Sequence, residues 1–66
     1  MFRNLEAEQA RYGYTNKDVA EKIGISRVSY ENKKKSGKFT TSEIKVLCKL
    51  FRCGFDYLFS TEEKGA

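Results

Sequence analysis

The stretch Thr15–Lys38, TNKDVAEKIGISRVSYENKKKSGK, decides how this chain folds. Gly24 is a helix stop, because glycine enters the left-handed backbone conformation without steric cost, and Ser26 is a good cap for a new helix. Because one helix ends at Gly24 and the next begins directly after Ser26, the two helices must cross sharply. The stretch therefore predicts a helix-turn-helix, with helices over Asn16–Ile23 and Arg27–Lys34, whose second helix can enter the major groove of DNA. The alternative is a helical hairpin with no role in DNA binding.

The charge distribution supports the first interpretation. Residues 11–38 hold eight Lys/Arg against three Asp/Glu, whereas residues 39–66 hold four of each, and the whole chain carries a net charge of +4. The basic excess thus falls on the two helices and the lysines that follow them, where a phosphate backbone would lie. A solvated lysine surface kept for solubility is the alternative.

The flanking segments predict three more helices. The first covers Phe2–Tyr12 and ends at the next glycine. Thr40-x-x-Glu43 is a capping box that opens an apolar helix, which Gly54 ends. A short, very apolar helix or turn then covers Phe55–Phe59. The expected fold class is all-α.

At 66 residues, the chain is expected to form one domain with a modest core. We expect this domain over residues 1–60, followed by a flexible polar tail over residues 61–66.

The outer side of the second helix of the helix-turn-helix carries the candidate base-reading residues. The Arg27 guanidinium fits O6 and N7 of guanine, Val28 can touch a thymine methyl and Asn32 can pair with adenine. Glu31 on this face would repel phosphate unless it accepts a hydrogen bond from a cytosine amine. Predicted phosphate contacts come from polar and basic side chains around the two helices: Asn16, Lys17, Ser26, Ser29, Tyr30, Lys33, Lys35 and Lys38. For Tyr30, a role as a core aromatic is the alternative.

Two expectations concern packing between segments. Glu8 borders the apolar face of the first helix, so we expect it to pair with Lys33 or Lys34; a solvent-facing glutamate is the alternative. The final segment has more aromatic surface than a small core needs, which predicts a dimer interface. The residues of that predicted interface are Phe55, Tyr57 and Phe59.

Several classes of function lack the residues they require. The chain has no histidine and only two cysteines, Cys48 and Cys53, which do not form a Cys-x-x-Cys pair. We therefore expect no metal site, no cofactor, no catalytic residues and reduced thiols. No apolar run approaches a signal peptide or a membrane span, so the expected location is cytoplasmic, with the DNA of the nucleoid.

The order TNKDVAEKIGIS, a basic helix, and then FTTSEIKVLCKLFRCGFDYLF resembles the phage-repressor-like helix-turn-helix family of the Cro and cI type, over about residues 4–59. The resemblance implies a compact five-helix, lambda-repressor-like fold, dimeric binding to an operator and control of transcription, often for a prophage or mobile element. By position, Asn16 matches the family's phosphate-gripping residue, and Arg27, Val28 and Asn32 match its base-reading positions.

The chain also departs from the family pattern. Many members pair a basic residue of the first helix with a late glutamate of the third, whereas Gln9 and Lys34 stand at these places here. Three lysines end the third helix where an apolar residue is common, which predicts a loosely packed last turn. Val28 replaces the usual polar reader, which predicts apolar recognition at that position.

These observations favour a sequence-specific DNA-binding regulator, either Cro-like or a small repressor, with double-stranded DNA as its partner. The alternative is a protein-interaction module, such as an antitoxin or anti-repressor, that uses the same fold to hold another protein.

Overall fold

The computed structural model describes residues 2–60, and every regular secondary-structure element in this part of the chain is a helix. It contains the helices α1 (Arg3–Tyr12), α2 (Asn16–Ile23), α3 (Arg27–Ser36), α4 (Thr41–Phe51) and α5 (Phe55–Leu58). The predicted all-α class, five-helix architecture and helix-turn-helix are therefore confirmed. The expected tail over residues 61–66 lies outside the described residues.

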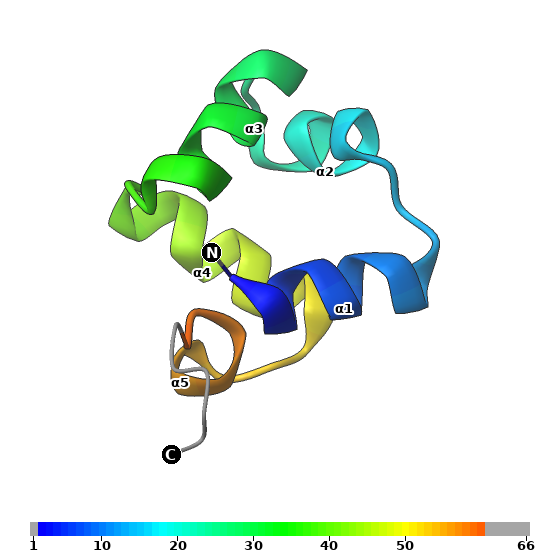
Figure 1. Cartoon of the computed structure of the whole chain (residues 1–66), viewed down its shortest axis with the longest axis vertical. Coiled ribbons are helices and arrows are strands. Elements are labelled where there is room, and N and C mark those ends of the chain that lie inside the picture. The colour runs from blue at the N-terminus through cyan, green and yellow to red at the C-terminus, as the bar shows by residue number, and fades with distance from the viewer. Residues whose placement is uncertain (1, 61–66) are drawn as a thin grey trace.

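The helices lie in an order that separates the two ends of the molecule. In Figure 1, α2 and α3 occupy the upper half of the view, α1 crosses below α2, and α5 lies at the bottom. The helix-turn-helix and α5 thus lie toward opposite ends of the longest axis. A surface formed by α5 is consequently separate from the outer face of α3.

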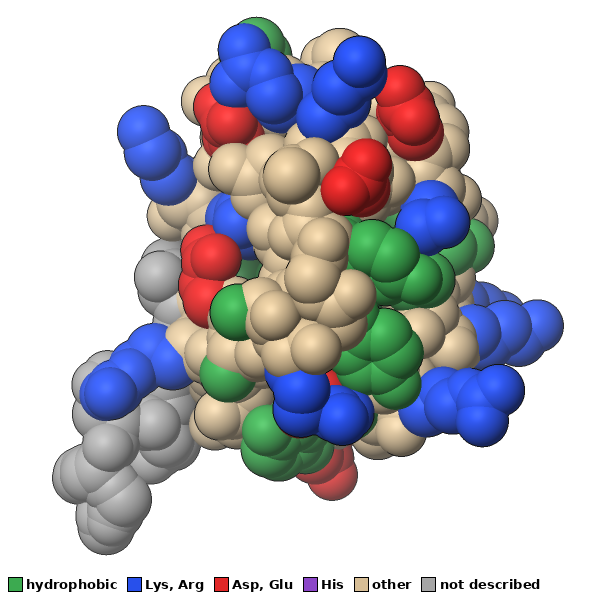
Figure 2. Space-filling model, turned by 90° about the vertical axis from the view of Figure 1, so that its right-hand side faces the viewer, with side chains coloured by type: hydrophobic (Ala, Val, Ile, Leu, Met, Phe, Trp, Pro, Cys, Tyr) green, Lys and Arg blue, Asp and Glu red, His purple; other side chains and the backbone are tan. Residues whose placement is uncertain are grey.

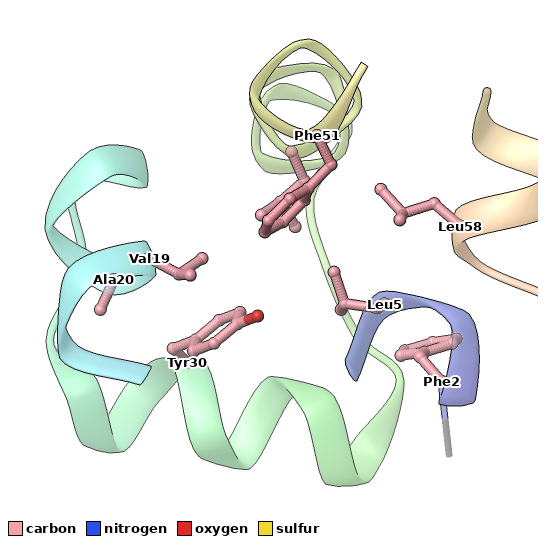
Figure 3. Packing of buried hydrophobic residues seen from close by; sticks show 8 residues of the cluster. Phe2, Leu5, Val19, Ala20, Tyr30, Phe51 and Leu58 are labelled. Atoms are coloured by element: carbon pink, nitrogen blue, oxygen red, sulfur yellow. The ribbon is translucent and has the colours of Figure 1, made fainter. Parts of the chain in front are cut away.

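Every helix contributes to one core, which forms between α1, the helix-turn-helix and α4. Figure 3 shows Tyr30 reaching inward from α3, between Val19 of α2 and Leu5 of α1. The buried apolar residues of the core are Phe2, Leu5, Val19, Ala20, Tyr30, Leu47, Phe51 and Leu58. Since α1 and α4 support α2 and α3 from behind, the outer face of α3 stays open.

Local sequence explains the tight turn between α2 and α3. Thr15 and Asp18 form a reciprocal capping box at the start of α2, where each side chain accepts a hydrogen bond from the other's backbone N–H. Gly24 ends α2 with a φ of 82°, in the left-handed region. Ser26 then caps α3, because its hydroxyl accepts a hydrogen bond from the Ser29 N–H at 3.1 Å. Ala20, which is 1% exposed, lies buried against the core.

Two expected helix ends were wrong. Helix α3 continues to Ser36 rather than Lys34, and Gly37 ends it with a φ of 78°. Helix α4 ends at Phe51, where Arg52 takes the left-handed conformation with a φ of 54°. Gly54 does not end α4; it is the N-cap residue of α5. The N–H of Cys53, one residue beyond Arg52, closes the last turn of α4.

The last turn of α3 is not loosely packed, contrary to expectation. Lys34 is 8% exposed, and its ammonium lies 2.9 Å from Glu6 and 4.8 Å from the centre of the Tyr30 ring. Its neighbour Lys33 pairs with Glu43 of α4 at 3.4 Å. The lysine stems thus fill the space that an apolar residue would take, while the ammonium groups find acidic partners.

The expected pairing of Glu8 with Lys33 or Lys34 was also wrong. The Glu8 carboxylate accepts hydrogen bonds from Arg11 at 2.8 and 3.0 Å and from the Tyr57 hydroxyl at 3.1 Å. An ion pair between α1 and α3 does exist, but Glu6 supplies its carboxylate. Glu8 instead connects α1 to α5.

Candidate nucleic-acid interface

The outer face of α3 presents four of the predicted site residues side by side. Arg27, Val28, Glu31 and Asn32 have the spacing that places side chains on one face of a helix. Val28 is 54% exposed, although it is apolar, and Asn32 is also exposed. Lys35 continues the same face one turn later. The face therefore combines a guanidinium, a methyl-bearing side chain and an amide, which are groups that can contact base edges.

Arg27 and Glu31 form an ion pair on this face. The guanidinium Nη1 lies 2.7 Å from Glu31 Oε2, with a side-chain exposure of 53% for Arg27 and 33% for Glu31. The same carboxylate oxygen accepts a hydrogen bond from Asn16 Nδ2 at 3.1 Å. The bonds from Arg27 and then Asn16 hold the pKa of Glu31 below its usual value. Glu31 is therefore ionised at neutral pH.

Asn16 joins three helices through its side-chain amide. While its Nδ2 donates to Glu31, its Oδ1 accepts hydrogen bonds from Gln9 Nε2 at 3.0 Å and from Lys34 Nζ at 2.8 Å. We call Gln9, Asn16, Arg27, Tyr30, Glu31 and Lys34 the polar network. The Asn16 side chain, predicted to grip a phosphate, is thus already occupied within the protein.

Tyr30 is not a phosphate contact, contrary to one of the two expectations for it. The residue is 0% exposed, and its hydroxyl donates a hydrogen bond to Gln9 Oε1 at 2.8 Å inside the molecule. Burial raises the pKa of the Tyr30 hydroxyl well above its usual value. The alternative role, as a core aromatic, is the one that the structure shows.

The predicted phosphate contacts differ in how accessible they are. Lys17, Ser26, Lys35 and Lys38 are exposed, whereas Ser29 and Lys33 are half-buried. Lys33 is already paired with Glu43, so its charge is partly neutralised. Figure 2 shows the face on the right-hand side of Figure 1, where basic side chains are intermixed with acidic ones at the top and project along the lower margins. That face carries no uniformly basic patch.

Comparison with protein families gives a match to the Cro/C1-type HTH DNA-binding domain over residues 4–64. This match spans nearly the whole chain and covers the five helices of the described residues, apart from the first residue of α1. The chain belongs to the Cro/C1-type helix-turn-helix family. Comparisons with curated proteins and with solved structures gave no match.

Membership of the Cro/C1-type family makes double-stranded DNA the partner and transcription regulation the role of this domain. In this Cro/C1-type domain, α3 is the helix that follows the tight turn, which is the place of the recognition helix in a helix-turn-helix. Among residues 2–60, no three or more His, Cys, Asp or Glu side chains gather in a way that could hold a metal ion. No helix in the described part has both the length and the apolar character needed to cross a membrane.

The aromatic residues of the predicted dimer interface lie on and just after α5 of the Cro/C1-type domain. Phe55 is 54% exposed and Tyr57 is 45% exposed, while Phe59 is half-buried and packs against Phe2 and Phe39. The rings of Phe55 and Phe59 stack at 5.5 Å between centres. Phe59 thus belongs mainly to the domain's own packing, whereas Phe55 and Tyr57 present ring surface outward.

Sequence reasoning missed the parts played by Gln9 and Lys34 in the polar network. A signal was present for both, because Gln9 shares a face of α1 with Leu5, and Lys34 follows the buried Tyr30 by one helical turn. No comparable signal links Asn16 to Glu31, since their contact depends on how α2 crosses α3.

Proposed function

We propose that this Cro/C1-type domain is a sequence-specific regulator, Cro-like or a small repressor, that is encoded by a prophage or mobile element and binds its operator in the cytoplasm. The observation that carries the proposal is the exposed outer face of α3, where Arg27, Val28 and Asn32 offer different base-reading chemistry. Phosphate contacts fall to Lys17, Ser26, Ser29, Lys33, Lys35 and Lys38, and to the backbone N–H groups at the start of α2 near Asn16.

Selection of binding sites from random duplex DNA tests sequence specificity directly. We expect an enriched motif with two half-sites related by two-fold symmetry and spaced about 34–36 Å apart, one helical turn of DNA. Equal binding to all duplexes at every salt concentration would contradict a sequence-specific regulator. Tight, salt-insensitive capture of a protein with weak affinity for DNA would favour the antitoxin or anti-repressor alternative.

The exposed lysines in the last turn of α3 and just after it provide a separate test of phosphate contact. Lys35→Ala and Lys38→Ala should each make the slope of log K against log salt shallower by about 0.9, because each lost contact leaves one fewer counterion to release. The affinity should fall by a similar factor for all sequences. Lys49→Ala on α4 removes the same charge away from α3 and serves as the matched control, whose slope should match that of the wild type.

For the assembly, we propose a homodimer on DNA that uses Phe55, Tyr57 and Phe59. Support comes from the exposed rings of Phe55 and Tyr57 and from an apolar groove beside them, which Phe2, Phe39, Ile44, Phe55 and Phe59 help to line. A second copy of the chain would cover this surface at the end of the molecule away from α2 and the start of α3. Sedimentation at saturating operator should give two protomers per site, as two-fold symmetric half-sites require.

A further inference from the structure

Within the part of the chain that the structure describes, Glu31 contacts the Arg27 guanidinium through one nitrogen, Nη1. Its Oε2 lies 2.7 Å from Nη1, and the structure gives the Nε–H and Nη2 groups no hydrogen-bond partner within residues 2–60. In a guanidinium, Nη1 lies on the side of Cδ, whereas Nε–H and one Nη2–H point in parallel from the other edge. Glu31 thus occupies one side of the group and leaves the two-pronged edge open. That edge has the spacing to donate to O6 and N7 of a single guanine.

The Glu31 carboxylate, which pairs with Arg27, also accepts a hydrogen bond from Asn16 of α2. Asn16 Nδ2 donates to the same Oε2 at 3.1 Å, and the Asn16 Oδ1 is fixed by Gln9 and Lys34. Gln9 and Lys34 are 7% and 8% exposed, so this chain of contacts runs from the surface of α3 into the packed body of the domain. A long, exposed arginine would otherwise spread over many rotamers, and ordering it costs free energy on binding.

The charge of Glu31 has a second effect on Arg27. An unpaired guanidinium on a DNA-facing helix is attracted by every phosphate within reach, regardless of sequence. A carboxylate at 2.7 Å offsets that attraction while leaving the hydrogen-bonding edge free. The pair therefore favours a directional contact with a base over a contact with the backbone.

We propose that Glu31 is a positioning residue that, supported by Asn16, holds Arg27 in its base-reading orientation and so sets the domain's discrimination for guanine. Glu31 then acts through Arg27 and does not itself read a cytosine amine. This inference rests on the proposed function, because it assumes that Arg27 contacts a base of the operator.

The test compares Glu31→Gln with the wild type on the selected duplex and on its single-position variants. At the position read by Arg27, we expect the ratio of affinities for guanine and for the other bases to fall at least about fivefold. A loss of this size lies within the discrimination that a bidentate base contact provides. Glu21→Gln, on the exposed side of α2, removes the same charge and is the matched control. Both variants should bind an unrelated duplex slightly more tightly, but only Glu31→Gln should relax the preference for guanine.

A double-mutant cycle separates positioning from direct reading. In an Arg27→Lys background, Glu31→Gln should cause no further loss of discrimination, because the group that it positions is gone. An equal loss in both backgrounds, or a loss confined to a cytosine position, would show that Glu31 reads a base itself and would overturn the proposal.

The free protein provides a measurement that does not depend on DNA. In nitrogen-15 spectra of the Arg27 guanidinium, the ion pair should slow rotation of Nη1 in the wild type, and Glu31→Gln should restore fast rotation. Fast rotation in the wild type would overturn the positioning role even if the domain proves sequence-specific. Conversely, slow rotation in a wild type that binds all duplexes alike would mean that the proposed function fails and that Arg27 reads no base.

Discussion

The hydroxyl of Tyr30 donates to Gln9 Oε1 at 2.8 Å, and both residues are buried, so no water replaces this bond when it is broken. Gln9 in turn donates to Asn16, which holds Glu31. A single phenolic oxygen beneath α3 is therefore connected, through the polar network, to groups on the outer face of α3.

Tyr30→Phe should lower the free energy of unfolding by about 1–3 kcal/mol, because it leaves the Gln9 carbonyl oxygen buried without a donor. Affinity for an unrelated duplex should stay at the wild-type level, since no phosphate contact is lost. Urea denaturation and binding titrations measure the two effects. A variant with wild-type stability and uniformly weaker DNA binding would contradict the core role of this hydroxyl.

At the scale of the element, helix ends differ in how well their residues suit the conformation they adopt. Gly24 and Arg52 both end helices in the left-handed region, with φ of 82° and 54°. Only glycine occupies that region without a steric penalty. The end of α4 is therefore strained by its arginine, while the end of α2 is not.

Arg52→Gly should stabilise the domain by up to about 1 kcal/mol, the relief of the left-handed penalty less the added freedom of the unfolded chain. Gly24→Ala should destabilise it by about 1–2 kcal/mol. A Cβ added at Gly24 would meet no atom within 4 Å, so this cost is conformational and not steric. Thermal and urea unfolding of the two variants should move in opposite directions; a shift in the same direction would refute the assignment of strain.

The cap of α2 makes stability depend on pH. The pKa of Asp18 lies below its usual value because its carboxylate accepts a hydrogen bond from the backbone of Thr15. A carboxyl group whose pKa is lower in the folded state stabilises the fold above its unfolded pKa of about 3.9. That contribution disappears as the pH falls through the lower, folded-state value.

Asp18→Asn should accordingly be less stable than the wild type at pH ~7, because it loses the charged cap. The difference in free energy of unfolding should narrow as the pH falls below ~4 and should be smallest where Asp18 is protonated in the folded state as well. Urea denaturation across this range measures the difference. A gap of constant size would mean that the carboxylate charge contributes nothing.

At the scale of the whole molecule, the proposed interface on α5 lies away from α2 and the start of α3, so assembly and DNA contact can be changed separately (Figure 1). Phe55 is 54% exposed and lies beside the apolar groove, whereas Val46 of α4 is 38% exposed and does not line it. The two positions therefore form a matched pair for introducing a charge.

Phe55→Glu should change the free energy of unfolding by less than about 1 kcal/mol, as expected for a substitution at an exposed site. It should nevertheless abolish the two-protomer complex on the operator, because a buried carboxylate in an apolar interface is costly. Val46→Glu should leave the complex intact. If sedimentation finds the same stoichiometry for both variants, the dimer does not form through α5.

How far the sequence predicts this domain depends on the range of the interactions. The capping residues Thr15, Ser26 and Thr40 and the stop at Gly24 act within one turn, so four of the five helix starts and the tight turn were predicted to the residue. The end at Arg52 was missed because local rules assign left-handed caps to glycine. The outer face of α3 was also predicted, because helical spacing alone defines it.

Interactions between helices were predicted less well. Lys34 was expected to lie in a loosely packed turn and was one of two candidate partners for Glu8, yet its side chain is buried and its ammonium contacts Glu6 and Asn16. Glu6 and Glu8 point to different sides of α1. Which of them reaches α3 therefore depends on how the two helices cross. Contacts of this kind can be identified only once the packing of the helices is known.

The polar network has a consequence for anyone who wishes to give this domain a new DNA target. Recognition helices are natural units to transplant between relatives, since their outer residues read the bases. Here the graft could not be limited to α3, because Glu31 and Lys34 are held by Asn16 of α2, and Tyr30 by Gln9 of α1. A transplanted helix without complementary groups would remove the α3 partners of the Gln9 and Asn16 side-chain amides. Positions 9 and 16 must therefore be exchanged together with the helix.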